Sequence, residues 1–213
     1  MTGKGRGIGK MTIHFDNPTT PHANASSEVL ALLALNTELL SNNSATLTLE
    51  RWCDRHGLAS PARVIAKRIH GAEKPSTVEQ RQLLSAQITD HICYRRVRLC
   101  CGGLVLSEAD NWYLPGRLTP EMNWELEDTD TAFGRVVQTL DFRRRTLSAK
   151  YLWSPPSAVI RMRDLGTDRL QVPFRLLEHR AVLTLPDGTP FCLLTEIYTS
   201  ALLAFLKPSR RAA

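Results

Sequence analysis

The sequence predicts one α+β domain in which helices pack on one face of an antiparallel sheet. Apolar residues make up 43% and charged residues 23% of the 213 residues, proportions typical of a globular chain with a sizeable core. Helix-capping signals gather in the first part of the chain, whereas the second half is rich in strand patterns joined by turn sequences. Helices followed by antiparallel hairpins favour the α+β class.

Capping residues predict four helices. Ser26 or Ser27 can cap the first, and Gly57 suits the position just after the end of the second. Ser76 and Glu79 are spaced as a capping box ahead of a short third helix. The fourth opens with a threonine cap, a proline at the first helical position and an acid in the first turn. The four are expected at about residues 26–40, 46–56, from 76 onward, and 119–127.

Strands are expected where apolar and β-branched residues alternate between turn sequences. Gly102-Gly103 joins one predicted hairpin, and Pro186-Asp187-Gly188 joins another. Two further segments have strand character but no hairpin partner next to them in the sequence. The expected strands cover residues 62–69, 91–101, 104–114, 142–153, 175–185 and 190–198.

The net charge of +6 belongs to the ends of the chain. Without the first sixteen and the last seven residues, 21 basic residues face 20 acidic ones. Proteins that bind nucleic acid usually concentrate positive charge on a folded face, so no nucleic-acid partner is expected. We expect a disordered basic arm over residues 1–25, a folded domain over 26–206, and a basic tail over 207–213.

The cysteines indicate a reducing compartment. Their number, five, is odd and no CxxC pair is present, so free thiols are expected instead of a disulfide framework. Cys53 and His56 have a metal-like spacing, but no second pair follows, and no metal is expected. No apolar run approaches the roughly 18 residues of a membrane span, and cytoplasm is the expected location.

Glu196 is the most informative polar residue because it interrupts an apolar strand. Alternation places it on the same face as Cys192, Leu194 and Tyr198. A carboxylate on such a face must pair with a cation, take up a proton or serve a ligand, since burying it unpaired costs several kcal/mol. A structural ion pair, or an edge position facing water, would explain it equally well.

Arg95 is the second polar residue in an apolar setting. Period-two alternation places it with Val97 and Leu99 on one face, and Arg96 on the other. A half-buried guanidinium is a natural bidentate partner for a carboxylate of a ligand, or for Glu196 in a structural salt bridge. A register shift by one residue would bring Arg96 inward instead.

Two further segments carry possible binding groups. Phe133 and Gly134 lie at a turn into a short helix, where backbone N–H groups could meet an anion, although a plain packing turn is also possible. Residues 143–145 are three consecutive arginines, which we interpret as a solvated strand face with one inward side chain.

These segments together resemble the chorismate lyase family of ubiquinone biosynthesis. The four similar segments follow the order of the family's motifs and fall within about residues 28–205, and the last is the most specific. They are LLSNNSAT, similar to a flap over the pocket, YRRVRLCCGG, TDTAFGRVV, and LEHRAVLTLPDGTPFCLLTEIY, which contains the L-L-T-E core.

The resemblance implies a six-stranded antiparallel sheet with helices on one side and an internal pocket. It implies a monomeric lyase that eliminates pyruvate from chorismate to give 4-hydroxybenzoate, without metal or cofactor. Arg95 would bind the substrate carboxylate and Glu196 would meet the ring hydroxyl, as the two catalytic residues. The substrate-binding residues would be Phe133, Gly134, Arg96 and Ala45, the last in place of a flap methionine.

Departures from the family pattern leave other functions open. Glu108 and Asp110 stand near the first hairpin and would weaken binding of an anionic substrate if they faced inward. The alternative is a non-catalytic module that binds or senses a hydroxybenzoate-like carboxylate, because the ligand-sensing domain of GntR-type regulators is similar to chorismate lyase. A catalytically inactive relative is a third possibility. Residues 47–69 also have a helix-turn-helix appearance, which a DNA-binding regulator would need.

Overall fold

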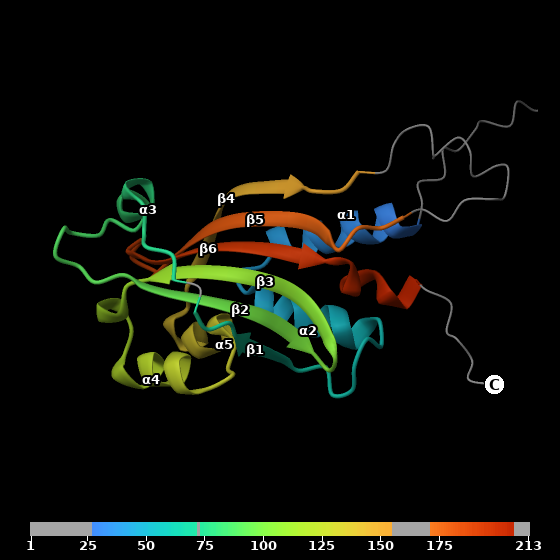
Figure 1. Ribbon diagram of the computed structural model, residues 1–213, viewed down its shortest axis with the longest axis horizontal. Helices are drawn as coiled ribbons and strands as arrows, with labels where there is room; N and C mark the ends of the chain where they lie inside the picture. Colours follow the sequence, from blue (N-terminus) through green and yellow to red (C-terminus); the bar gives the residue numbers. More distant parts are fainter. Residues whose placement is uncertain (1–26, 72, 155–170, 207–213) are drawn as a thin grey trace, which may run out of the picture.

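The chain folds around one six-stranded antiparallel sheet, which confirms the predicted α+β class (Figure 1). The computed structural model describes residues 27–71, 73–154 and 171–206. The strand order is β1-β2-β3-β6-β5-β4, so the two predicted hairpins, β2–β3 and β5–β6, meet at β3 and β6 in the middle of the sheet. The strands are β1 Val64–Arg68, β2 Cys93–Cys101, β3 Leu104–Tyr113, β4 Arg143–Tyr151, β5 Arg175–Thr184 and β6 Pro190–Thr199.

Most helices lie on one side of this sheet, as predicted. In Figure 1, α1 and α2 lie behind the strands and α4 and α5 below them, whereas α3 stands apart near one end of the sheet. Short 3₁₀ turns follow β3, α5 and β6. The helices are α1 Ser27–Leu40, α2 Ala45–Arg55, α3 Val78–Leu83, α4 Pro120–Asp128 and α5 Phe133–Val136, and the 3₁₀ turns are η1 Pro115–Arg117, η2 Val137–Leu140 and η4 Ser200–Leu206.

Capping explains where the shorter helices begin. Thr119 caps α4 by accepting a hydrogen bond from the Met122 backbone N–H at 3.2 Å. The capping box of α3 lies one residue later than the predicted pair Ser76 and Glu79. It joins Thr77 and Gln80 through reciprocal bonds of 3.2 and 2.9 Å, because the extended backbone of Thr77 places its hydroxyl over the first turn.

Residues 47–69 do not form the helix-turn-helix that their appearance suggested, and the strand predicted over residues 62–69 is present instead. This strand is β1, which pairs antiparallel with β2 from Val64 opposite Cys101 to Arg68 opposite Val97. β-branched and small side chains suit this edge position of the sheet. The predicted basic arm (1–25) and basic tail (207–213) lie outside the described residues, and the domain limits 26–206 stay a prediction.

Two apolar clusters fill the space between the sheet and the helices that cover it. One joins α1 and α2 to the central strands, and the other joins α4, α5 and Phe142 to β5 and β6. A third cluster, around Trp112, Leu193 and Leu84, lies on the opposite face of the sheet below α3. Helices therefore cover one face, and the α3 region covers only one end of the other.

No helix among the described residues is long and apolar enough to cross a membrane. The longest described helix, α1, has 14 residues.

Candidate functional site

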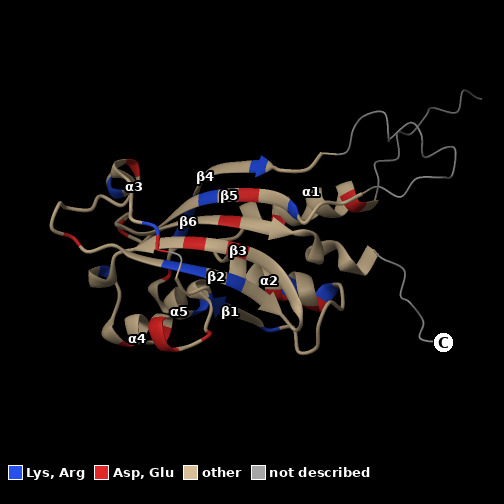
Figure 2. Cartoon of the chain, in the orientation of Figure 1, with Lys and Arg blue, Asp and Glu red and all other residues tan. Residues whose placement is uncertain are grey.

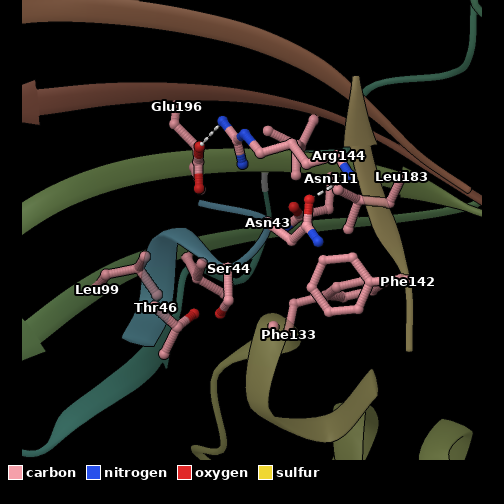
Figure 3. Close-up of a pocket in the computed structure, with 14 residues that line it drawn as sticks. Asn43, Ser44, Thr46, Leu99, Asn111, Phe133, Phe142, Arg144, Leu183 and Glu196 are labelled. Carbon is pink, nitrogen blue, oxygen red and sulfur yellow. Dashed lines mark hydrogen bonds and ion pairs between the residues drawn. The ribbon is translucent and has the colours of Figure 1, made fainter. Parts of the chain in front are cut away.

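A small chamber lies between the sheet and the segments that cover it (Figure 3). Its volume is about 30 Å³, which is room for one or two water molecules. Apolar side chains from β2, β3, β5 and β6, together with Phe133 and Phe142, form most of the wall. The polar residues of the wall are Asn43, Ser44, Thr46, Asn111, Arg144 and Glu196.

Glu196 is the carboxylate of this chamber, on the inner face of β6. Its side chain is 6% exposed, and its Oε2 accepts hydrogen bonds from Arg144 Nη2 and from the Tyr198 hydroxyl, each at 2.7 Å. The salt bridge between Arg95 and Glu196 that the sequence left open is not formed, since Arg144 takes that place. Such a charge-assisted, buried arrangement holds the carboxylate in one orientation.

The surroundings of Glu196 raise the pKa values of both of its partners, Arg144 and Tyr198. Burial alone would lower the pKa of Arg144, but the charges of Glu196 and Tyr198 and the hydrogen bonds to them together outweigh it, and the pKa is raised. Burial, and then the charge of Glu196, raise the pKa of Tyr198 well above its ordinary value, so its hydroxyl stays a donor. Arg144 Nε is buried without a partner in the described part of the chain, and it remains available to an acceptor.

Arg144 reaches the chamber from β4, the last strand of the sheet. It stands opposite Leu183 of β5, and its backbone N–H donates to Asn43 Oδ1 at 3.2 Å. Arg143 and Arg145 are exposed, which agrees with the expected single inward side chain of the arginine run. The loop between α1 and α2 is thereby tied to β4 directly above the chamber.

Arg95 is buried on the inner face, as alternation predicts, but it does not line the chamber. It is 1% exposed, and Nη2 donates to the Thr131 carbonyl at 3.3 Å. Its Nε and Nη1 have no partner among the described residues. Burial lowers the pKa of Arg95 to about 10. Asn111, opposite Arg95 in the register of β2 and β3, does line the chamber.

A row of buried polar groups continues from Glu196 toward β4. The ring of His179 packs edge-on against Tyr198 with centroids 5.1 Å apart, and its Nε2 lies 2.7 Å from Asn36 Oδ1. Asn36 Nδ2 donates to the Tyr151 hydroxyl at 2.8 Å, so Asn36 Oδ1 accepts a proton carried on His179 Nε2. Burial lowers the pKa of His179, which favours this neutral form.

Phe133 and Gly134 both line the chamber, as predicted. A Cβ atom on Gly134 would lie 2.9 Å from Ser44 Oγ and 3.1 Å from Thr46 Oγ1, so the glycine lets α5 approach the start of α2 closely. Ser44 is the cap of α2 and accepts from the Leu47 N–H at 3.3 Å. At four residues α5 is too short for an anion site at its N-terminus, so packing explains the glycine.

Two other residues predicted to bind substrate lie outside the chamber. Arg96 is on the opposite face of the sheet, 3.7 Å from the carboxylate of Asp110, because neighbouring residues of a strand point to opposite sides. Ala45 is buried at the start of α2, but its neighbours Ser44 and Thr46 face the chamber in its place.

The extra acids of β3 also lie on the opposite face. Glu108 pairs with Arg98 at 3.6 Å and with Arg175 at 3.2 Å. Asp110 pairs with Lys74 at 2.5 Å and accepts from the Tyr94 hydroxyl at 2.5 Å. Figure 2 shows basic residues on β2 beside acidic residues on the neighbouring β3. These acids therefore do not oppose an anion inside the domain.

Sequence reasoning missed three polar residues of the site. Arg144 was hidden within a run of three arginines, and only its period-two position could have distinguished it. Asn111 shares a strand face with Ala109 and Tyr113, a signal equal to that of Arg95. Asn43 lies in the LLSNNSAT segment, but nothing local distinguishes it there, because its role depends on the contact of its loop with β4.

Among residues 27–71, 73–154 and 171–206, no group of three or more His, Cys, Asp or Glu side chains is arranged to hold a metal ion. The chamber offers one carboxylate, one guanidinium and several hydroxyl and amide groups. These groups can bind and orient a small polar molecule by hydrogen bonds and charge.

Comparison with known proteins gives one close relative and several distant structures. No protein-family model matches the chain. YydK from Bacillus subtilis, a possible transcriptional regulator, is 17% identical, with a TM-score of 0.39 over 63% of this chain and 57% of that one. The effector domain of PhnF from Mycobacterium smegmatis is 13% identical, with a TM-score of 0.49 over 74% and 88%. The ligand-binding domain of a putative GntR-family regulator from Bordetella bronchiseptica is 13% identical, with a TM-score of 0.41 over 64% and 82%.

The prediction of a chorismate lyase-type enzyme is wrong. The matching structures are named as transcriptional regulators or as their effector and ligand-binding domains, and none of these three is named as a lyase. The expected links to chorismate, pyruvate and ubiquinone have no support.

The relative is "Uncharacterized protein y4mC" of Sinorhizobium fredii. It is 49% identical over 199 residues, which cover 90% of this chain and 82% of that protein. An identity of this size over most of both chains means a shared fold and a shared descent. The chain therefore belongs to the same family as y4mC of Sinorhizobium fredii.

Proposed function

We propose that this chain is a non-catalytic domain that binds, and thereby senses, a small molecule with a carboxylate group. One observation carries the proposal. The inner face of the sheet buries the guanidinium groups of Arg95 and Arg144, but Glu196 is the single buried carboxylate among the described residues. The described interior thus holds one positive charge more than negative, and a monoanionic ligand would balance it.

The unpaired nitrogen atoms indicate where the ligand charge is needed. Arg144 Nε, together with Arg95 Nε and Nη1, is buried without a hydrogen-bond partner in the described residues. A buried charged group without partners is expensive, and the cost is recovered when an anion arrives. We assign Arg144 as the contact of the ligand head group, and Arg95 as a second source of positive potential at the same face.

Glu196 has a different role in this proposal. Because Arg144 and Tyr198 occupy its Oε2, the other oxygen of the Glu196 carboxylate is left as an acceptor facing the chamber. A hydroxyl or amine of the ligand would donate to it. Phe133 and Gly134 form the wall opposite the sheet and exclude water from the head group.

The cysteines support action in the cytoplasm. All five are free, and four of them are buried: Cys53, Cys100, Cys101 and Cys192. Unpaired thiols of this number are typical of a reducing compartment.

Calorimetric titration of the purified chain with small carboxylates tests the proposal. We expect saturable binding of a monocarboxylate such as 4-hydroxybenzoate or glycolate, with the ligand recovered unchanged afterwards. Arg144→Ala should weaken binding by about tenfold or more, since a charge-assisted hydrogen bond is worth roughly 1.5–3 kcal/mol. Arg95→Ala should weaken binding by less, because Arg95 lies outside the chamber and contributes only its positive charge. The matched control is Arg96→Ala, which removes the neighbouring arginine on the other face and should leave the affinity unchanged.

Two results would contradict this function. One is the absence of binding by every carboxylate tested while the protein is folded by circular dichroism. The other is equal loss of affinity in the Arg96→Ala control, which would place the anion on the outer face of the sheet.

A further inference from the structure

A second hollow lies against the outer side of the chamber. Its volume is about 240 Å³, eight times that of the chamber's 30 Å³. Asn43, Ser44 and Phe142 line both spaces, so the two hollows adjoin at these three residues. We call this second hollow the outer groove, and it is lined by Asn42, Asn43, Ser44, Leu47, Arg51, Gln138, Asp141 and Phe142.

The two volumes set a limit on the ligand. A chamber of about 30 Å³ accepts a carboxylate or hydroxyl group but not an aromatic ring. The rest of any larger ligand must therefore lie outside the chamber. The outer groove is the hollow that meets the chamber at Asn43, Ser44 and Phe142.

The groove is built from groups that pair with hydroxyls. Gln138 offers an amide and Asp141 offers a carboxylate, and both groups can pair with an alcohol. The side chains of Gln138 and Asp141 form no hydrogen bond with another residue in the described ranges, so they are available. Leu47 and Phe142 supply apolar surface for C–H groups.

Arg51 is already fixed in position at the groove. Its Nη2 donates to Asn42 Oδ1 at 3.0 Å and to Thr48 Oγ1 at 3.1 Å. The positive charge of Arg51 and the negative charge of Asp141 cancel, so the groove is neutral overall while the interior behind it is positive. This division suits an uncharged, hydroxylated body joined to one anionic head.

We infer that the outer groove is the second half of the binding site and takes the body of a sugar acid, whose carboxylate reaches Arg144 in the chamber. This inference rests on the proposed function and narrows its ligand class. It places the ligand specificity in Gln138, Asp141 and Arg51, outside the segments that the sequence marked as functional.

Calorimetry with two probes separates the groove from the chamber. D-glucuronate carries both the head and the hydroxylated body, whereas glycolate carries little more than the head. We expect D-glucuronate to bind at least tenfold more tightly than glycolate. Gln138→Ala should weaken D-glucuronate roughly three- to tenfold, the worth of one neutral hydrogen bond, and leave glycolate unchanged.

Two further variants complete the test. Asp141→Asn keeps a residue that tolerates the left-handed backbone at this position (φ 48°) and should weaken D-glucuronate in the same range. Gln82→Ala, on exposed α3, is the matched control and should change neither probe.

The outcomes distinguish the inference from the function beneath it. If D-glucuronate and glycolate bind equally, or if Gln138→Ala and Asp141→Asn bind D-glucuronate like the unmodified chain, the groove has no part and the carboxylate site stands alone. Tighter binding of 4-hydroxybenzoate than of D-glucuronate also overturns the inference. Absence of binding by all three carboxylates overturns both.

Discussion

Replacing Arg95 by methionine should make the unliganded protein more stable. The guanidinium is 1% exposed and has one hydrogen bond, a 3.3 Å contact with the Thr131 carbonyl. Methionine has a similar length and no charge, so it fills the same space without the cost of a buried cation. Buried ionic groups replaced by apolar residues of similar volume often show this gain.

The size of the effect follows from the pKa of Arg95. Burial lowers the pKa of Arg95 from 12.5 to about 10. Below about pH 10 the folded protein therefore carries the charge at a cost in free energy that the unfolded chain does not have. At about 1.4 kcal/mol for each tenfold change in a protonation constant, holding the charge costs about 3 kcal/mol. The variant also loses the hydrogen bond to the Thr131 carbonyl, which reduces the expected gain in stability by about 1 kcal/mol. The free energy of unfolding should therefore rise by about 2 kcal/mol.

Chemical and thermal unfolding measure this change. For a domain of this length, about 2 kcal/mol corresponds to a rise in Tm of roughly 4–8 °C. The matched control is Arg96→Met, whose parent side chain is 30% exposed and 3.7 Å from Asp110. A half-exposed pair of that kind contributes little, so the control should stay within about 0.5 kcal/mol of the unmodified chain.

A fall in the free energy of unfolding of Arg95→Met would refute the reasoning. It would mean that the unpaired nitrogen atoms of Arg95 are compensated in the native protein and that no ligand charge is missing. A gain in stability together with a loss of carboxylate binding would instead explain why the chain keeps a costly buried charge.

The remaining predictions concern a buried histidine and a close packing contact. Burial lowers the pKa of His179, so its contribution to stability is complete above the unfolded value of 6.5 and is lost as pH falls below it. Urea unfolding between pH 8 and pH 5 should show a steeper fall in the free energy of unfolding for the unmodified chain than for His179→Gln. An equal fall in both would contradict this prediction. The control is His91→Gln, at an exposed position, which should show the same fall as the unmodified chain. Gly134→Ala should lower the free energy of unfolding by about 1–2 kcal/mol, because the added methyl group would lie 2.9 Å from Ser44 Oγ. Gly116→Ala has open space around it and should change the free energy of unfolding little. Equal free energies of unfolding for the two variants would contradict the packing argument.

Local sequence patterns predicted the elements of the fold because their causes are local. Capping residues place the helix starts to within a residue or two, and the glycine pair 102–103 marks the first hairpin. Period-two alternation also placed Arg95 and Glu196 on the inner face and Arg96 on the outer one, since side-chain direction along a strand depends on the strand alone.

The same patterns did not predict which groups meet. Glu196 pairs with Arg144, 52 positions away, because β5 lies between their strands and the register brings both side chains over the chamber. The ion-pair partners of Glu108 and Asp110 on the outer face likewise depend on the strands that lie near β3.

The sequence by itself determined the α+β class, the hairpins and the face of each strand, because these follow from backbone geometry and from the burial of apolar side chains. Only the tertiary structure decided that Arg144 holds Glu196, that Arg95 stays unpaired, and that the chamber is small with a larger groove outside it. Those properties arise from strand order, register and the packing of α2 against α5, which join residues far apart in the chain.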